Sequence, residues 1–120
     1  MPISNKDATS LWEIVRAIEY IQAFTVGMGY GDYLANNLLQ SGVERKFEII
    51  GAAVRRLSDE FRQDHPEIDW RDLVGLRNII AHRYDQVDQA ILWDAIESVL
   101  PVLIEQVRVL LPPILDIEEV

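Results

Sequence analysis

The chain has 120 residues, 49% of them hydrophobic and 26% charged, which excludes a disordered chain and suits one domain over residues 1–120, with residues 112–120 as a frayed tail. A net charge of −9 argues against general nucleic-acid binding, and the lack of cysteine excludes disulfides and thiolate chemistry. Because no apolar run is long enough to span a membrane and no signal peptide is evident, we expect a cytoplasmic protein without membrane contact.

Apolar residues recur with a helical period along the whole chain, and no segment alternates as a strand would. The first helix is predicted to follow a capping box at Ser4 and Asp7, or at Ser10 and Glu13. Its apolar stripe comprises Leu11, Ile14, Val15, Ile18 and Ile21. The glycine-rich run at 27–33 ends it; without a preceding strand this run is a helix stop rather than a phosphate loop. A short helix is expected over 32–39.

A second long helix is predicted to begin where Ser41 and Glu44 have capping-box spacing. Its apolar residues alternate at intervals of four and three, which indicates a narrow seam facing another helix. The seam consists of Val43, Phe47, Ile50, Val54, Leu57 and Phe61. This helix should end at His65-Pro66, because a proline disfavours helix at the preceding residue.

Two further helices complete the prediction. One begins near Asp69, and the last is capped by Asp88 and distorted by Pro101, which lacks a backbone donor. The inward residues are Leu73, Leu76 and Ile80 in the first, and Ile91, Leu92, Ala95, Val99, Val102, Leu103 and Leu110 in the second. The sequence thus predicts an all-α, antiparallel four- to five-helix bundle. Its apolar surface exceeds the need of one core, which favours a homodimer.

Charge is unevenly distributed along the chain. Residues 41–83 hold eight of the eleven basic residues and eight of the twenty acids, so this third is neutral and the remainder carries the whole charge of −9. A local anion site in this segment is compatible with that pattern, and so are ordinary solvated helix faces.

Of the two histidines, His65 precedes a proline and is expected on the surface. His82 lies in the run Gly75 to Tyr84, which also holds Arg77, Asn78 and Arg83. An imidazole moves protons near neutral pH and a guanidinium binds phosphate oxygens, so the pair can cleave RNA without a metal or other cofactor. No cluster of metal ligands is evident. Alternatively, His82 only caps a helix C-terminus.

Helix geometry restricts such a site. At about 100° per residue, Asn78 and His82 share a face, whereas Arg77 and His82 point about 140° apart. The two side chains cannot grip one phosphate from a single regular helix. Either the helix loosens near His82, or a second copy of the domain completes the site.

The stretch from Val43 to Leu111 resembles the HepT-like family of HEPN proteins. The similarity lies in Val43–Gly51, in Ile68-Asp69-Trp70 and in Leu76–Tyr84, followed by the helix of Trp93 and Leu100-Pro101. The family signature is an arginine, a polar residue, three further residues, a histidine, any residue and a tyrosine. It is met here by Arg77, Asn78, His82 and Tyr84. One departure is Ala52, where the family usually has glutamate.

The resemblance implies a dimeric bundle that acts as a metal-independent endoribonuclease toxin on RNA, with no DNA substrate expected. Paired Arg77 and His82 would form one cleft between protomers, supported by Asn78 and Arg83. The partner would be a minimal nucleotidyltransferase antitoxin that transfers AMP to Tyr84. Two alternatives remain: a non-catalytic helical module that binds the nucleotidyltransferase and is its AMPylation substrate, and a purely structural dimer.

Overall fold

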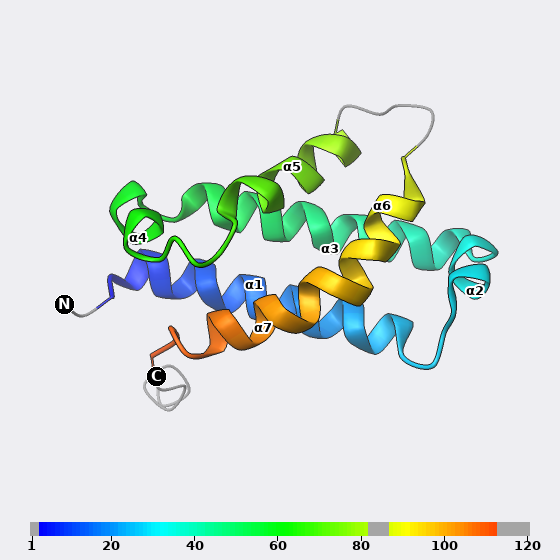
Figure 1. Ribbon diagram of the computed structural model, residues 1–120, viewed down its shortest axis with the longest axis horizontal. Helices are drawn as coiled ribbons and strands as arrows, with labels where there is room; N and C mark the ends of the chain where they lie inside the picture. Colours follow the sequence, from blue (N-terminus) through cyan, green and yellow to red (C-terminus); the bar gives the residue numbers. More distant parts are fainter. Residues whose placement is uncertain (1–2, 82–86, 113–120) are drawn as a thin grey trace.

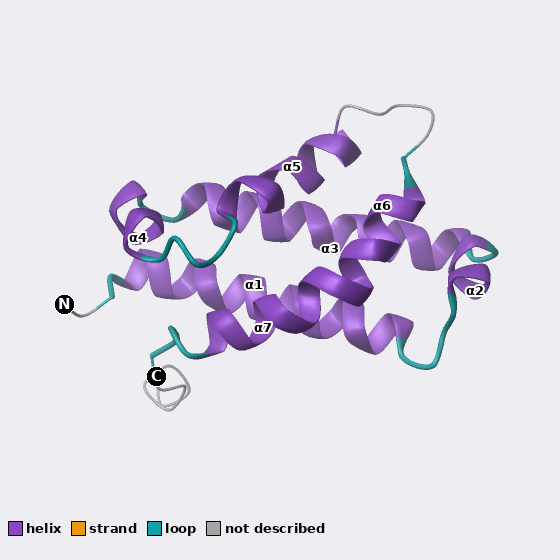
Figure 2. Cartoon of the chain, viewed as in Figure 1, coloured by secondary structure: helices purple, strands orange, loops and turns teal. Residues whose placement is uncertain are grey.

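The computed structural model describes residues 3–81 and 87–112, and all regular structure in those ranges is helical (Figure 2). In chain order the elements are α1 (Asn5–Thr25), α2 (Tyr30–Leu34), α3 (Asn37–Arg56), α4 (Asp59–Asp64), α5 (Trp70–Ala81), α6 (Gln89–Asp94), the π-helical turn η1 (Ala95–Val99) and α7 (Leu100–Arg108). The all-α prediction is confirmed. No helix in the described ranges is both long enough and apolar enough to cross a membrane.

The two longest helices, α1 and α3, lie antiparallel and form the centre of the bundle (Figure 1). The predicted α1 stripe is buried along its full length, and so is the α3 seam as far as Leu57. Helix α5 runs back along α3, and α7 packs on α1. Ser4 is the N-cap of α1 and accepts a hydrogen bond from the Asp7 N–H, so the helix starts at the first of the two proposed positions, although the Asp7 carboxylate binds Ser58 and does not complete a capping box.

The predicted bounds of the second long helix are wrong at both ends. Helix α3 begins one turn earlier than Ser41, because the Asn36 side chain accepts from the Leu39 N–H at 2.9 Å and caps it there. The short helix expected over 32–39 is α2, which ends at Leu34. At its far end α3 stops at Arg56, well before His65.

A buried carboxylate explains the early stop. Asp7, from the first turn of α1, accepts hydrogen bonds from both the N–H and the hydroxyl of Ser58, each at 2.8 Å. The Ser58 Oγ in turn accepts from the Phe61 N–H, which starts α4 as a separate helix. Burial raises the pKa of Asp7, but the Ser58 and Ser4 hydrogen bonds and the nearby Lys6 charge hold it below its usual value.

His65 is half-buried, which corrects the prediction of a surface residue. Its ring centroid lies 4.5 Å from that of Phe61, and its Nδ1 lies 3.5 Å from a Glu67 carboxylate oxygen. It ends α4, where the residue before Pro66 leaves the helical conformation.

The last helix is divided into α6, η1 and α7. Asp88 caps α6 as predicted, accepting from the Ala90 and Ile91 N–H groups. The distortion expected at Pro101 takes the form of a π-helical turn, in which the Leu100 N–H bonds to the Ala95 carbonyl five residues back. The predicted stripe is buried at Leu92, Ala95 and Leu103. It is wrong at Ile91, Val99 and Val102, whose exposed fractions are 40, 38 and 58%.

We predict that Asp7→Asn lowers the free energy of unfolding by about 1 to 3 kcal/mol at pH 7, because the Ser58 donors lose a buried charged acceptor. Asp94→Asn, on an exposed face, is the matched control and should change it by about 0.5 kcal/mol at most. Urea unfolding measures both.

The loss of stability in Asp7→Asn should depend on pH, and the lowered pKa of Asp7 sets the direction of this dependence. Because the folded-state pKa of Asp7 is lowered, its stabilisation is complete above the unfolded-state pKa and is lost as the pH falls through the folded value. The difference in the free energy of unfolding between wild type and Asp7→Asn should therefore become smaller below about pH 4. A gap that widens in acid would contradict this assignment.

Candidate active site

Helix α5 carries the first residues of the predicted motif and is fixed at its start. Asp69 accepts from the Asp72 N–H at 3.1 Å and caps the first turn. The buried Trp70 donates its indole N–H to the His65 carbonyl at 3.0 Å. Arg77 and Asn78 lie two turns further along α5. The position of these two residues is thus tied to the α4–α5 connection.

Arg77 lies directly on the backbone of α3 at Gly51. A Cβ placed on Gly51 would lie 2.4 Å from the Arg77 Cβ and 2.9 Å from its Cδ, which is closer than any real contact. Only glycine therefore permits this approach of α5 to α3. The aliphatic part of Arg77 packs on the α3 backbone and the residue is half-buried, so its direction is restricted by the packing of the two helices.

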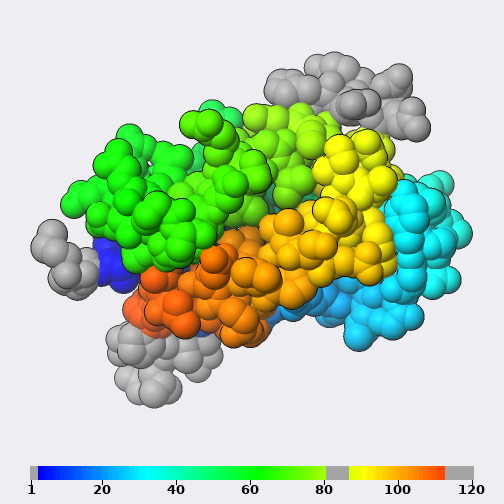
Figure 3. All heavy atoms as spheres, in the orientation of Figure 1, coloured from blue at the N-terminus to red at the C-terminus, as the bar shows by residue number. Residues whose placement is uncertain are grey.

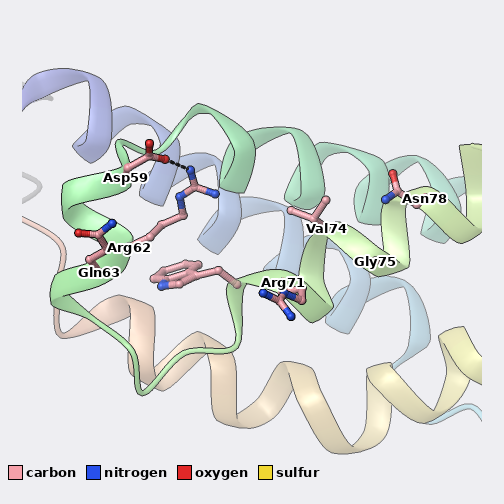
Figure 4. A pocket seen from close by; sticks show the side chains of 8 residues that line it. Asp59, Arg62, Gln63, Arg71, Val74, Gly75 and Asn78 are labelled. Atoms are coloured by element: carbon pink, nitrogen blue, oxygen red, sulfur yellow. Dashed lines mark hydrogen bonds and ion pairs between the residues drawn. The ribbon is translucent and has the colours of Figure 1, made fainter.

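Asn78 lies on a different face, in an open groove of about 580 Å³ between α4 and α5 (Figure 4). We call it the arginine groove. Its lining residues are Asp59, Arg62, Gln63, Trp70, Arg71, Val74, Gly75 and Asn78. Asp59 and Arg62 form an ion pair on α4, and Arg71 to Asn78 extend away from it along α5 (Figure 4). The groove thus leads from α4 to the polar residue of the motif.

A second groove, of about 590 Å³, lies on the other side of α5, against α6, η1 and α7. We call it the acidic groove. Its charged lining residues are Glu67, Asp69, Asp72 and Asp94, with no basic residue among the described residues that line it. A hydrogen bond and the charge of Asp69 raise the pKa of Asp72. The three exposed apolar residues of the last helix, Ile91, Val99 and Val102, also line it. Figure 3 shows this face, where α5 lies beside α6 and α7.

A polar cluster anchors the start of α6. Gln89 donates its amide N–H to Glu44 of α3 at 2.7 Å and accepts from the hydroxyl of the fully buried Tyr33 of α2. Burial, followed by the charge of Glu44, raises the pKa of Tyr33, so its hydroxyl stays protonated as a donor. The chain is therefore fixed to α3 both before and after residues 82–86.

His82, Arg83 and Tyr84 lie outside the described residues. Of the four predicted motif side chains, the structure places Arg77 against α3 and Asn78 in the arginine groove. Ala52, the departure from the family pattern, is half-buried on α3 next to Gly51.

Sequence reasoning did not single out three residues of this region: Gly51, which contacts Arg77, and Arg62 and Arg71, which belong to the basic residues of 41–83 and line the groove. The spacing of Arg71 and Asn78, seven apart on one helix face, was the available signal for the groove. No comparable signal marked Gly51, whose role depends on a contact between separate helices.

Comparisons with known proteins identify the family of this chain. Residues 14–110 match the family described as "Ribonuclease HepT-like". The chain belongs to the HepT-like ribonuclease family. A protein of Thermococcus cleftensis provisionally named ribonuclease HepT is 37% identical over 103 residues, which cover 86% of this chain and 92% of that protein. A provisionally named RNase of Methanocaldococcus jannaschii is 31% identical over 108 residues, which cover 89% of this chain and 99% of the relative. No solved structure matches this HepT-like chain.

Two glycines of this HepT-like protein should respond oppositely to alanine. Gly51→Ala forces α3 and α5 apart, and overpacking of this kind should lower the free energy of unfolding by about 1 to 3 kcal/mol. Gly75→Ala meets no atom within 4 Å and should gain up to about 1 kcal/mol from helix propensity. Urea unfolding midpoints measure both. A Gly51→Ala protein as stable as wild type would show that the contact with Arg77 is not tight.

Proposed function

We propose that this HepT-like protein is a metal-independent endoribonuclease in which Arg77 and His82 carry the reaction. The observation that supports this most directly is the Gly51–Arg77 contact, which restricts a motif arginine by packing it on α3. Membership of a ribonuclease family supplies the reaction class. The relatives with provisional ribonuclease names, which align over most of their length, agree with it.

The chemistry needs only these two groups. His82 takes the proton from the ribose 2′-hydroxyl as its oxygen attacks the adjacent phosphorus; the bond from phosphorus to the 5′-oxygen breaks, the 5′-oxygen receives the proton from His82, and a 2′,3′-cyclic phosphate remains. Arg77 stabilises the additional negative charge on the phosphate oxygens. Asn78 and Arg83 support the site by binding the neighbouring polar groups of the substrate.

We further propose that the site is composite, with Arg77 of one protomer and His82 of another. On one regular helix these side chains would point about 140° apart, which would disfavour their joint action within one chain. The exposed apolar residues Ile91, Val99 and Val102 supply a surface for self-association beside α5.

The proposed partner is a nucleotidyltransferase antitoxin that transfers AMP to Tyr84. The added phosphodiester and base would repel and block RNA at the motif. Two observations favour the alternative of a non-catalytic module that serves as the AMPylation substrate: the net charge of −9 and Ala52 in place of the family's glutamate.

We expect Arg77→Ala and His82→Ala each to reduce RNA cleavage by about 10² to 10⁴, the usual cost of losing proton transfer or charge stabilisation. Wild-type cleavage should persist in EDTA. Product analysis should show 2′,3′-cyclic phosphate ends. A folded variant of either kind that cleaves at the wild-type rate refutes the assignment, and a wild type that never cleaves favours the non-catalytic alternative.

Mixing the two inactive variants tests the composite site. A heterodimer of Arg77→Ala and His82→Ala retains one intact Arg77–His82 pair if each site is shared between protomers. Mixed and exchanged proteins should therefore regain up to about a quarter of wild-type activity, since half the dimers are heterodimers with one of two sites intact. Light scattering should show that the wild type and both variants are dimers, because the test depends on exchange of protomers. No recovery in exchanged dimers would place both groups in one chain.

A further inference from the structure

We propose that the arginine groove binds the sugar–phosphate backbone of the RNA beside the bond that is cleaved. This inference rests on the proposed ribonuclease function and extends it to residues outside the motif. It assigns binding to Arg62 and Arg71, two positioning residues that take no part in the reaction itself.

The groove aligns phosphate-binding side chains with the motif. Arg71 and Asn78 share one face of α5, and seven residues separate them by about 10 Å along the axis. Arg62 faces them from α4 across the groove (Figure 4). A strand lying along α5 can therefore contact Asn78 near the cleaved bond and the two arginines further along its backbone.

Arg71 is available for a ligand. It is exposed, and the described part of the chain places no carboxylate within ion-pair distance of its guanidinium. Arg45 and Arg56, exposed on α3, each lie within 4 Å of a glutamate. The exposed Arg16 and Arg55 share the lack of such a partner among the described residues, so Arg71 is distinguished by its position in the groove. A guanidinium without a carboxylate partner suits a phosphate, to which it donates two parallel hydrogen bonds.

The guanidinium of Arg62 has few polar partners among the described residues. Its only ion-pair partner among the described residues is Asp59, whose side chain is 85% exposed, so water weakens the attraction. Its buried Nε has no acceptor in the described part of the protein. A phosphate in the groove can compete with Asp59 for this guanidinium.

Gly75 leaves the groove wall open. It lies within α5, where glycine costs helix stability, yet a Cβ there would meet no atom within 4 Å. Packing among the described residues therefore does not require glycine at this position. The wall beside it is rigid, because the indole of Trp70 is hydrogen-bonded to the His65 carbonyl. Gly75 lines both grooves, and an open helix surface of this kind suits the close approach of a nucleic-acid strand on the side where the charge is favourable.

The acidic groove on the other side of α5 cannot take the same role. Its four carboxylates would repel RNA, and its apolar residues suit a protein surface. The charge of the two grooves thus favours RNA, rather than protein, as the occupant of the arginine groove.

Binding can be tested separately from cleavage with a fluorescent 12-nucleotide RNA carrying 2′-O-methyl groups, which cannot react. Anisotropy titrations over a range of salt concentrations give the slope of log affinity against log salt. Arg62→Ala and Arg71→Ala should each reduce the slope by about 0.7 and weaken binding roughly tenfold at low salt. Arg71→Lys keeps the positive charge and should leave the salt slope unchanged. Asp59→Asn removes the carboxylate that pairs with Arg62 and should strengthen RNA binding. Arg16→Ala, on an exposed face of α1, is the matched control and should match wild type.

The outcomes separate this inference from the proposed function. If wild type binds the modified RNA through these arginines but leaves unmodified RNA intact, the groove assignment stands and the ribonuclease proposal fails. If wild type cleaves RNA while Arg62→Ala and Arg71→Ala bind with wild-type affinity and slope, the groove assignment is overturned. It is also overturned if these variants change the oligomeric mass instead of RNA binding, since the groove would then be a protein interface.

Discussion

The contact between Gly51 and Arg77 determines how the rest of this region is arranged. It requires α5 to approach the α3 backbone more closely than any other residue at position 51 would permit. That approach directs Arg77 toward α3 and rotates its neighbour Asn78 by about 100° into the groove beside α4. It also leaves a groove open along each side of α5. Gly51 therefore restricts the direction of the motif arginine, and the two grooves lie on the faces of α5 to either side of that contact.

Long helices with a regular apolar period could be predicted well from the sequence. The α1 stripe, the α5 start near Asp69 and the Asp88 cap are all where the pattern placed them, because each depends on residues within a few turns. The end of α3 could not be predicted, since it results from hydrogen bonds between Asp7 and Ser58, 51 positions apart. Local periodicity continued through Leu57 and Phe61 and concealed the break.

The candidate site shows the same division between local and long-range information. The resemblance to the HepT-like family selected Arg77 and Asn78 as candidates, and spacing added only the argument that Arg77 and His82 would point apart on one regular helix. The contribution of Gly51 is a contact between helices, and that of Arg62 comes from a short helix whose separate existence was not predicted. The three exposed residues Ile91, Val99 and Val102 were expected in the core, because a stripe on a helix does not reveal whether one chain or two will cover it.

The net negative charge of this protein is compatible with an RNA substrate, because the carboxylates and the arginines beside α5 lie on opposite sides of that helix. Carboxylates gather in one groove, while the other has two arginines and a single exposed aspartate. A net charge of −9 opposes long-range attraction of nucleic acid, so the proposed groove would hold RNA by a few local contacts rather than by a broad basic surface. Few phosphate contacts mean a shallow salt dependence and weak non-specific binding. Such an enzyme would bind RNA only where a strand can reach both the groove and the motif, which by itself restricts its substrates.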